Sequence, residues 1–113
     1  MRQTSPLGEF EQLVLLAILR LDKDATGTRI AQELEGRAAR SASRSALYTA
    51  LDRLEKKGFL RWEVRATTSS DRGGQPVRRF SVTEAGLEAI REAHAAWTSL
   101  TTGLEDLLRR KTS

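Results

Sequence analysis

The sequence predicts a mainly α-helical domain that carries a small two-stranded β ribbon and ends in a long helix. Apolar residues recur at helical spacing in four segments, which indicates four amphipathic helices. Between the third and fourth segments the pattern changes to alternating apolar and polar residues on both sides of a turn-rich stretch, which is typical of a β-hairpin. A chain of 113 residues is long enough for one domain with a buried core.

The composition excludes several classes of protein. The chain has no cysteine and a single histidine, His94, so neither a disulfide framework nor a multi-histidine metal site is expected. No apolar run reaches membrane-spanning length, and acidic residues stand where a signal peptide needs an apolar segment. No set of nucleophile, base and orienting residue is recognisable. We therefore expect a cytoplasmic protein that is not an enzyme and that needs no metal or cofactor.

The first helix is expected over residues 7–21, and its apolar surface is wide. Leu15, Leu16 and Leu19 extend this surface well beyond a single stripe. A helix of this kind must be covered on more than one side. Cover by another subunit is the favoured interpretation, and complete burial by other helices of the same chain is the alternative.

The second and third helices each have a polar start and a glycine stop. Thr26 or Thr28 can cap a short helix that ends at Gly36. The third helix is expected to begin after Ser43 as its N-cap and to end at Gly58, after two lysines in the last turn. Its inward face is a narrow stripe of three leucines: Leu47, Leu51 and Leu54.

The ribbon is expected from two alternating segments. Leu60, Trp62 and Val64 alternate with charged residues in the first strand, and Phe80 and Val82 face inward from the returning strand. Two strands alone are only marginally stable, so the ribbon is expected to pack against the helices. The turn between the strands bears a basic, glycine-rich tip: Arg72, Gly73, Gly74 and Gln75.

The last helix is expected to begin after Thr83 as its N-cap and to run to Leu108. Such a helix would be about 39 Å long and would project beyond so small a domain, so a partner helix is its natural cover. We therefore divide the chain into a helix-and-ribbon unit, residues 1–82, and a dimerisation helix, residues 83–113. The seam that resembles a heptad repeat comprises Leu87, Ile90, His94, Trp97, Thr101, Leu104 and Leu108.

Positive charge is concentrated in the middle of the chain. Residues 36–79 carry eleven basic and four acidic side chains, a balance of +7, whereas the balance is −2 for residues 1–35 and −1 for residues 80–113. A local field of this kind attracts a polyanion such as DNA. A merely solvated charged surface is the alternative.

Three helices, a two-stranded wing and a long final helix follow one another as in a winged helix-turn-helix domain. The segment LYTALDRLEKKGFL resembles the recognition-helix signature of the PadR family of transcriptional regulators, and GGQPVRRFSVTEAG resembles that family's wing and its entry into the C-terminal helix. The resemblance covers residues 7–108 and implies a homodimeric regulator of the short-tailed subgroup, usually a repressor. It also implies that the third helix enters the major groove of a double-stranded operator, that the wing tip lies towards the phosphates or the minor groove, and that the first and last helices hold the dimer.

The residue chemistry of the third helix and the ribbon is compatible with this role. Ser43, Ser45 and Thr49 are short hydrogen-bond donors near a helix start and suit phosphate oxygens, and arginine forks suit guanine edges or phosphates. Tyr48 lies outside the leucine stripe, so its ring and hydroxyl are expected to be free for the DNA backbone. Each of these residues could instead be an ordinary solvated side chain. The expected DNA contacts are Ser43, Arg44, Ser45, Tyr48, Thr49, Arg53, Arg72, Gly73, Gly74, Gln75 and Arg78.

Trp97 is a candidate ligand residue as well as a candidate interface residue. Some short members of the resembled family sense flat aromatic or cationic compounds between subunits, and paired indoles would offer stacking faces for such an effector, which would release the repressor. A plain interface anchor is the favoured interpretation of Trp97, and a winged helix used only for protein–protein interaction is the alternative function. The expected dimer contacts are Leu13, Leu16, Leu87, Ile90, His94, Trp97, Leu104 and Leu108.

Overall fold

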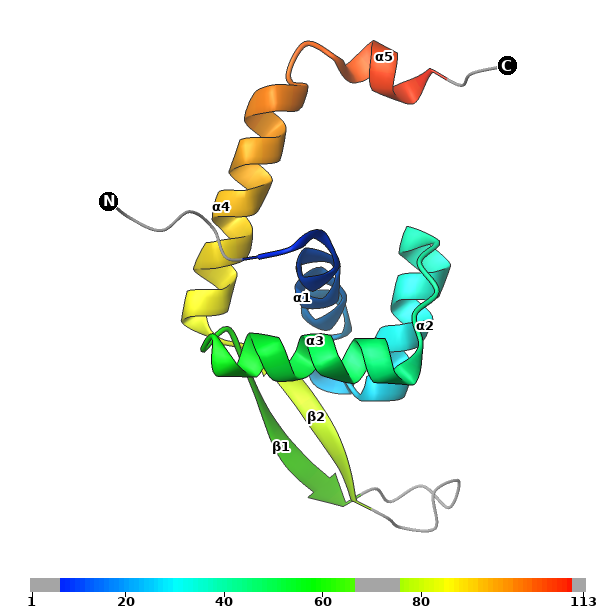
Figure 1. Ribbon diagram of the computed structural model, residues 1–113, viewed down its shortest axis with the longest axis vertical. Coiled ribbons are helices and arrows are strands. Elements are labelled where there is room, and N and C mark those ends of the chain that lie inside the picture. The colour runs from blue at the N-terminus through cyan, green and yellow to red at the C-terminus, as the bar shows by residue number, and fades with distance from the viewer. Residues whose placement is uncertain (1–6, 67–75, 111–113) are drawn as a thin grey trace.

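Three packed helices form the centre of the molecule, and the β ribbon and helix α4 project from them on opposite sides (Figure 1). The computed structural model describes residues 7–66 and 76–110. The mainly α-helical fold with a two-stranded antiparallel wing, predicted from the sequence, is confirmed. In chain order the elements are α1 (Glu9–Leu21), the short 3-10 turn η1 (Asp22–Asp24), α2 (Gly27–Ala38), α3 (Arg44–Lys56), β1 (Leu60–Ala66), β2 (Pro76–Val82), α4 (Glu84–Thr101) and α5 (Glu105–Arg109).

Helix α1 lies at the centre of the core, where α2, α3, α4 and β2 all contact it. Val14, Leu15 and Ile18 of α1 are buried. Leu16 and Leu19, on its outer side, remain 45% and 41% exposed. The wide apolar surface of this helix is therefore only partly covered within one chain.

Side chains cap the helices close to the predicted positions. The hydroxyl oxygens of Ser43 and Thr83 each accept a hydrogen bond of 3.0 Å from the backbone N–H three residues further on. At the start of α2 the cap is Thr26, not Thr28. These bonds satisfy N–H groups that have no partner within the first helical turn.

Helix α2 does not end at Gly36, so that expectation is wrong. The helix continues to Ala38, and Ala39 takes the left-handed conformation that terminates it, with φ of 52°. The carbonyl of Leu34 accepts the N–H of Arg40 at 3.1 Å across this stop. A glycine within a helix costs only about 1 kcal/mol relative to alanine, which is too little to break a helix whose buried face continues to pack.

The single helix expected to run to Leu108 is also wrong, because α4 ends at Thr101. Gly103 has a φ of 91°, which a helix cannot accommodate. The Thr102 hydroxyl donates a hydrogen bond of 2.6 Å to the carbonyl of Thr98 and so satisfies the end of α4. The predicted seam is therefore divided: Leu104 precedes α5 as its N-cap, Leu108 lies on α5, and the other seam residues lie on α4.

The ribbon packs its inner face against the helices. The strands pair antiparallel with Leu60 opposite Val82 and Trp62 opposite Phe80, and side chains opposite one another share a face. Leu60 and Phe80 are buried on that face, as the alternation predicted. The predicted tip, Arg72 to Gln75, lies outside the described residues.

Gly86 lets α4 approach the turn between α3 and β1 closely. A Cβ atom at this position would overlap the carbonyl oxygen of Phe59 and lie 2.9 Å from a methyl carbon of Val82. The Thr83 hydroxyl joins the same two segments by donating a hydrogen bond of 2.7 Å to the carbonyl of Gly58. These contacts fix the direction in which α4 leaves the core.

We predict that Gly86→Ala lowers the free energy of unfolding by about 1–3 kcal/mol, because the backbone of Phe59 must move. Gly36→Ala is the matched control. Gly36 is helical with no atom near its missing Cβ, so alanine there raises stability by about 0.5–1 kcal/mol. Denaturant unfolding followed by circular dichroism measures both changes. Equal effects of the two substitutions would show that the close approach at Gly86 is not formed.

Candidate DNA-binding surface

Helix α3 presents one buried and one exposed face. Leu47, Leu51 and Leu54 are buried in the core, as predicted. The opposite side is open to solvent and includes Arg44, Ser45, Thr49 and Arg53 among the expected DNA contacts.

Tyr48 is half-buried, so the expectation that its ring and hydroxyl are both free is wrong. Its ring lies edge-on to that of Phe80, with 6.4 Å between the ring centroids. A Cβ atom at Gly27 would overlap the Tyr48 hydroxyl, so the tyrosine also packs directly on the start of α2. Tyr48 therefore joins α3 to α2 and to the wing, and no sequence pattern indicates that Gly27 serves this contact.

Two arginines stack on aromatic rings between α3 and the wing. The guanidinium carbon of Arg44 lies 5.3 Å from the centre of the Tyr48 ring, and that of Arg78 lies 5.9 Å from the same centre. Arg78 also lies 4.6 Å from the ring centre of Trp62. These distances are within the range of cation–π attraction. We call these four residues the arginine–aromatic ladder: Arg44, Tyr48, Arg78 and Trp62.

On the other side of α3 a groove of about 800 Å³ separates this helix from the start of α1. Thr49 and Arg53 line the groove from α3, and Phe10 lines it from α1. These two expected DNA contacts therefore lie on the opposite flank of α3 from the ladder.

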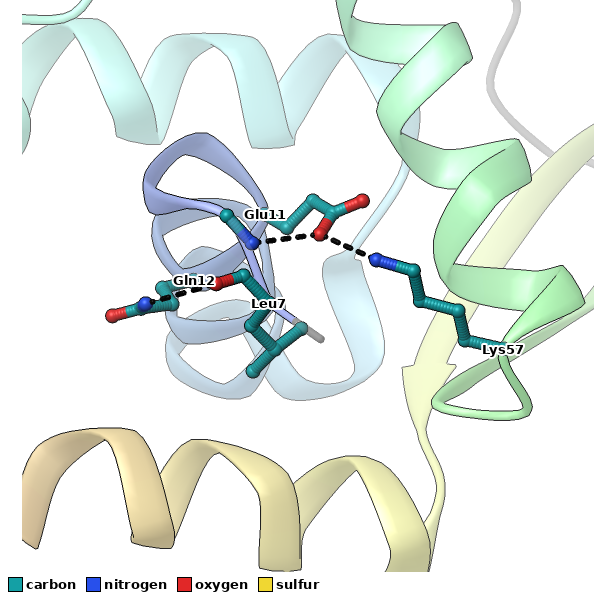
Figure 2. Close-up of polar contacts among 5 residues, drawn as sticks. Leu7, Glu11, Gln12 and Lys57 are labelled. Atoms are coloured by element: carbon teal, nitrogen blue, oxygen red, sulfur yellow. Dashed lines mark hydrogen bonds and ion pairs between the residues drawn. The ribbon is translucent and has the colours of Figure 1, made fainter. Parts of the chain in front are cut away.

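A partly buried ion pair ties the end of α3 to the start of α1 (Figure 2). Lys57 Nζ donates to Glu11 Oε1 at 2.8 Å, and the backbone N–H of Gly8 donates to the same oxygen at 2.9 Å. Glu11 is only 8% exposed. Burial raises the pKa of its carboxyl, but these two hydrogen bonds and the charges of Lys57 and Arg53 together outweigh burial and hold that pKa below its ordinary value of 4.5. Sequence reasoning missed this pair, whose only local sign is the capping-box spacing of Gly8 and Glu11.

Several basic side chains of residues 36–79 are neutralised by carboxylates. Those that have no ion-pair partner among the described residues lie on α3 and on the wing: Arg44, Arg53, Lys56, Arg61 and Arg78. The paired ones are Arg37 with Glu33, Arg40 with Glu9, Lys57 with Glu11, and Arg79 with Glu63. The cations without an ion-pair partner in the described part of the basic segment thus all lie on one helix and one ribbon.

The expected dimer contacts fall into three groups by exposure. Leu16, His94, Trp97, Leu104 and Leu108 are exposed, and Trp97 is 63% exposed. Leu13 and Leu87 are half-buried against the core. Ile90 is only 5% exposed and contributes to the core of its own protomer.

Residues 7–66 and 76–110 contain no group of three or more potential ligands placed to hold a metal ion. No helix in this described part of the chain combines the length and hydrophobicity needed to cross a membrane.

A three-helix core with a two-stranded wing, and with free positive charge on the third helix and the wing, defines a DNA-binding winged-helix protein. The chain belongs to the transcriptional regulator PadR-like family, whose family model matches residues 15–92. The resemblance carried by the two sequence motifs is therefore confirmed, and the family is one of regulators and not of enzymes.

Solved structures support the same fold. A PadR-like transcriptional regulator from Bacillus cereus is 20% identical to this chain, with a TM-score of 0.71, and the match covers 90% of this chain and 93% of the other. A PadR family regulator from Eggerthella lenta is 27% identical, with a TM-score of 0.65 and coverage of 91% and 88%. A PadR-like transcription factor from Bacteroides fragilis is 25% identical, with a TM-score of 0.66 and coverage of 87% and 88%. A comparison with curated proteins found no match.

We predict that Glu11→Gln lowers the free energy of unfolding at pH 7 by about 1–3 kcal/mol, because Lys57 loses a charged partner. The pKa of Glu11 is lower in the folded chain than in the unfolded one, so the stabilisation is present above the unfolded-state pKa. It is lost as the pH falls through the folded-state pKa. Urea unfolding of both proteins between pH 7 and pH 3 should show the difference shrinking in acid.

The matched control is Glu9→Gln, which removes an exposed ion pair with Arg40. We expect this change to cost about 0.5 kcal/mol or less. If the two substitutions have the same effect at every pH, the Glu11–Lys57 pair is no stronger than a surface contact.

Proposed function

We propose that the protein is a homodimeric transcriptional repressor that binds a double-stranded operator through α3 and the wing. The observation that carries this proposal is the location of the unpaired cations. In the described part of the basic segment they all lie on these two elements, whereas Arg37 and Arg40, which lie outside these elements, are both matched by carboxylates. A surface of this kind neutralises phosphates and releases their counterions.

In this proposal the exposed face of α3 enters the major groove. Ser43, at the helix start, contacts a phosphate together with backbone N–H groups, and Ser45 and Thr49 offer their hydroxyls to phosphates or to base edges. The ladder on one flank and Arg53 on the other carry guanidinium groups that suit phosphates or guanine edges. Contacts across both flanks fix the depth and register of the helix in the groove.

The wing extends the same surface along the duplex. Arg78 stands on the inner face of the ribbon, next to α3. The wing tip remains a predicted contact with the phosphates or the minor groove: Arg72, Gly73, Gly74 and Gln75.

Two copies of the chain pair through residues 83–113 and the outer side of α1. In a single chain several apolar side chains are exposed to water, which is unfavourable: Leu16 and Leu19 of α1, and Trp97 and Leu100 of α4. The leucines of α5 add to this surface. A two-fold dimer would place two α3 helices on half-sites separated by one turn of the DNA or by a multiple of it.

Trp97 is the residue through which an effector could act. Pairing of the C-terminal helices brings two indole rings into one interface, where a flat aromatic or cationic compound can stack on them. Such a compound would alter the spacing of the two α3 helices and so release the operator.

We predict that Arg44→Ala and Arg78→Ala each weaken binding to a DNA fragment selected from random sequence by roughly fivefold or more. Each loss should reduce the slope of log affinity against log salt by about one if the side chain contacts a phosphate. Arg91→Ala, on the exposed side of α4, is the matched control and should leave affinity unchanged. Fluorescence anisotropy at several salt concentrations measures these quantities, and an affinity that does not depend on salt would contradict the proposal.

We predict that Leu100→Glu converts the dimer to monomers in sedimentation equilibrium, because a carboxylate would be buried in an apolar interface. Ser99→Glu adds the same charge on the side of α4 opposite Trp97 and should leave the dimer intact. A dimer that survives Leu100→Glu unchanged would show that this part of α4 lies outside the interface.

A further inference from the structure

Asp52 occupies the centre of the exposed face of α3. It forms one stripe with Ser45, Thr49 and Lys56, and all four side chains are exposed. At 100° per residue this stripe lies on the side of the helix opposite the buried leucines. If α3 enters the major groove, no other stripe of this helix faces the base edges more directly.

The carboxylate of Asp52 has no ion-pair or hydrogen-bond partner among the described residues, although cations are close in sequence. Arg53 is adjacent and Lys56 is one helical turn away, at a spacing that commonly supports an ion pair. Among the other acidic side chains around α3, Glu9, Glu11 and Glu63 each pair with a basic residue, and Glu55 lies outside this stripe, on the same side of the helix as Tyr48. Asp52 is therefore an unneutralised negative charge in the middle of the most basic surface of the chain.

A carboxylate in this position works against non-specific DNA binding, because phosphates repel it. It can only accept hydrogen bonds, and most base atoms in the major groove also accept: guanine N7 and O6, adenine N7 and thymine O4. Cytosine is different because it presents the N4 amino donor with no acceptor on the same base edge. Adenine also has an amino donor, but its neighbouring N7 would repel the second carboxylate oxygen.

We propose that Asp52 determines sequence specificity by accepting a hydrogen bond from the N4 amino group of a cytosine in each half-site. This inference rests on the proposed DNA-binding function. Asp52 acts in two ways: it stabilises the complex at a C·G pair, and it disfavours the other bases by repulsion. Asp52 thus lowers the affinity for most DNA sequences and thereby raises the selectivity for sequences with cytosine at this position.

The first test is selection from random duplex DNA with the full-length protein and three variants. The wild-type half-site should contain one C·G pair that Asp52→Ala leaves free to vary, while the other positions are unchanged. Asp52→Asn should shift the preference at that pair towards A·T, because an amide matches adenine N6 and N7. Glu35→Gln removes another exposed carboxylate, on α2, and should reproduce the wild-type consensus.

The second test changes the base. N4-methylcytosine at the identified position keeps its Watson–Crick pair but places a methyl group where the free N4 hydrogen pointed into the groove. The wild-type protein should lose roughly 5- to 100-fold in affinity, the usual range for one incorrect base pair. Asp52→Ala should be nearly indifferent to the modification, which makes the pair of measurements a double-mutant cycle across the interface.

The outcomes separate this inference from the function on which it rests. An identical consensus for the wild type and both Asp52 variants, with only a uniform rise in affinity, would overturn the role of Asp52 while leaving DNA binding in place. If the wild-type protein enriches no sequence and shows no salt-dependent binding, the proposed function itself fails. Circular dichroism of the variants should match the wild type, because Asp52 makes no contact that the fold requires.

Discussion

Burial of α1 is the constraint on which the rest of the structure depends. Each of the other long elements packs against this helix: α2 and α3 directly, the wing through β2, and the C-terminal helix through the first turns of α4. Val14 and Leu15 are completely inaccessible to water, and side chains at this packing density leave neighbouring elements little freedom to shift. The orientation of α3 relative to the wing is thus a consequence of what both share with α1.

Polar and aromatic contacts refine this arrangement at both ends of α3. The Glu11–Lys57 pair holds its C-terminal end against α1, and Tyr48 holds its first half against Gly27 and β2. These contacts engage side chains at the two sides of α3. The side chains of the outer stripe make no contact on which the fold depends. A helix that is packed on its inner side, held near both ends and free on its outer side is suited to present side chains to a rigid partner.

Sequence reasoning identified those parts of the structure that depend on local chemistry. Three such features were predicted: the Ser43 and Thr83 caps, the leucine stripe of α3 and the alternation of the strands. Each depends on neighbours within a few residues, so its pattern can be recognised in the sequence. Two other contacts join positions far apart in the chain: the packing of Tyr48 on Gly27 and the Glu11–Lys57 ion pair. No rule based on local residue spacing predicts such contacts. The stop of α4 before Gly103 was missed for another reason: the seam pattern continued across it, but Leu100 and Leu104 on either side are exposed, so no apolar burial offsets the cost of a helical glycine.

The arginine–aromatic ladder has a thermodynamic consequence. A free arginine side chain loses about 2 kcal/mol of rotamer entropy when a partner immobilises it. Arg44 and Arg78 already lie over the rings of Tyr48 and Trp62, and this cation–π attraction restricts their side chains before any ligand arrives. Part of the side-chain entropy of these two arginines is therefore lost during folding. Binding of a phosphate then costs less additional side-chain entropy.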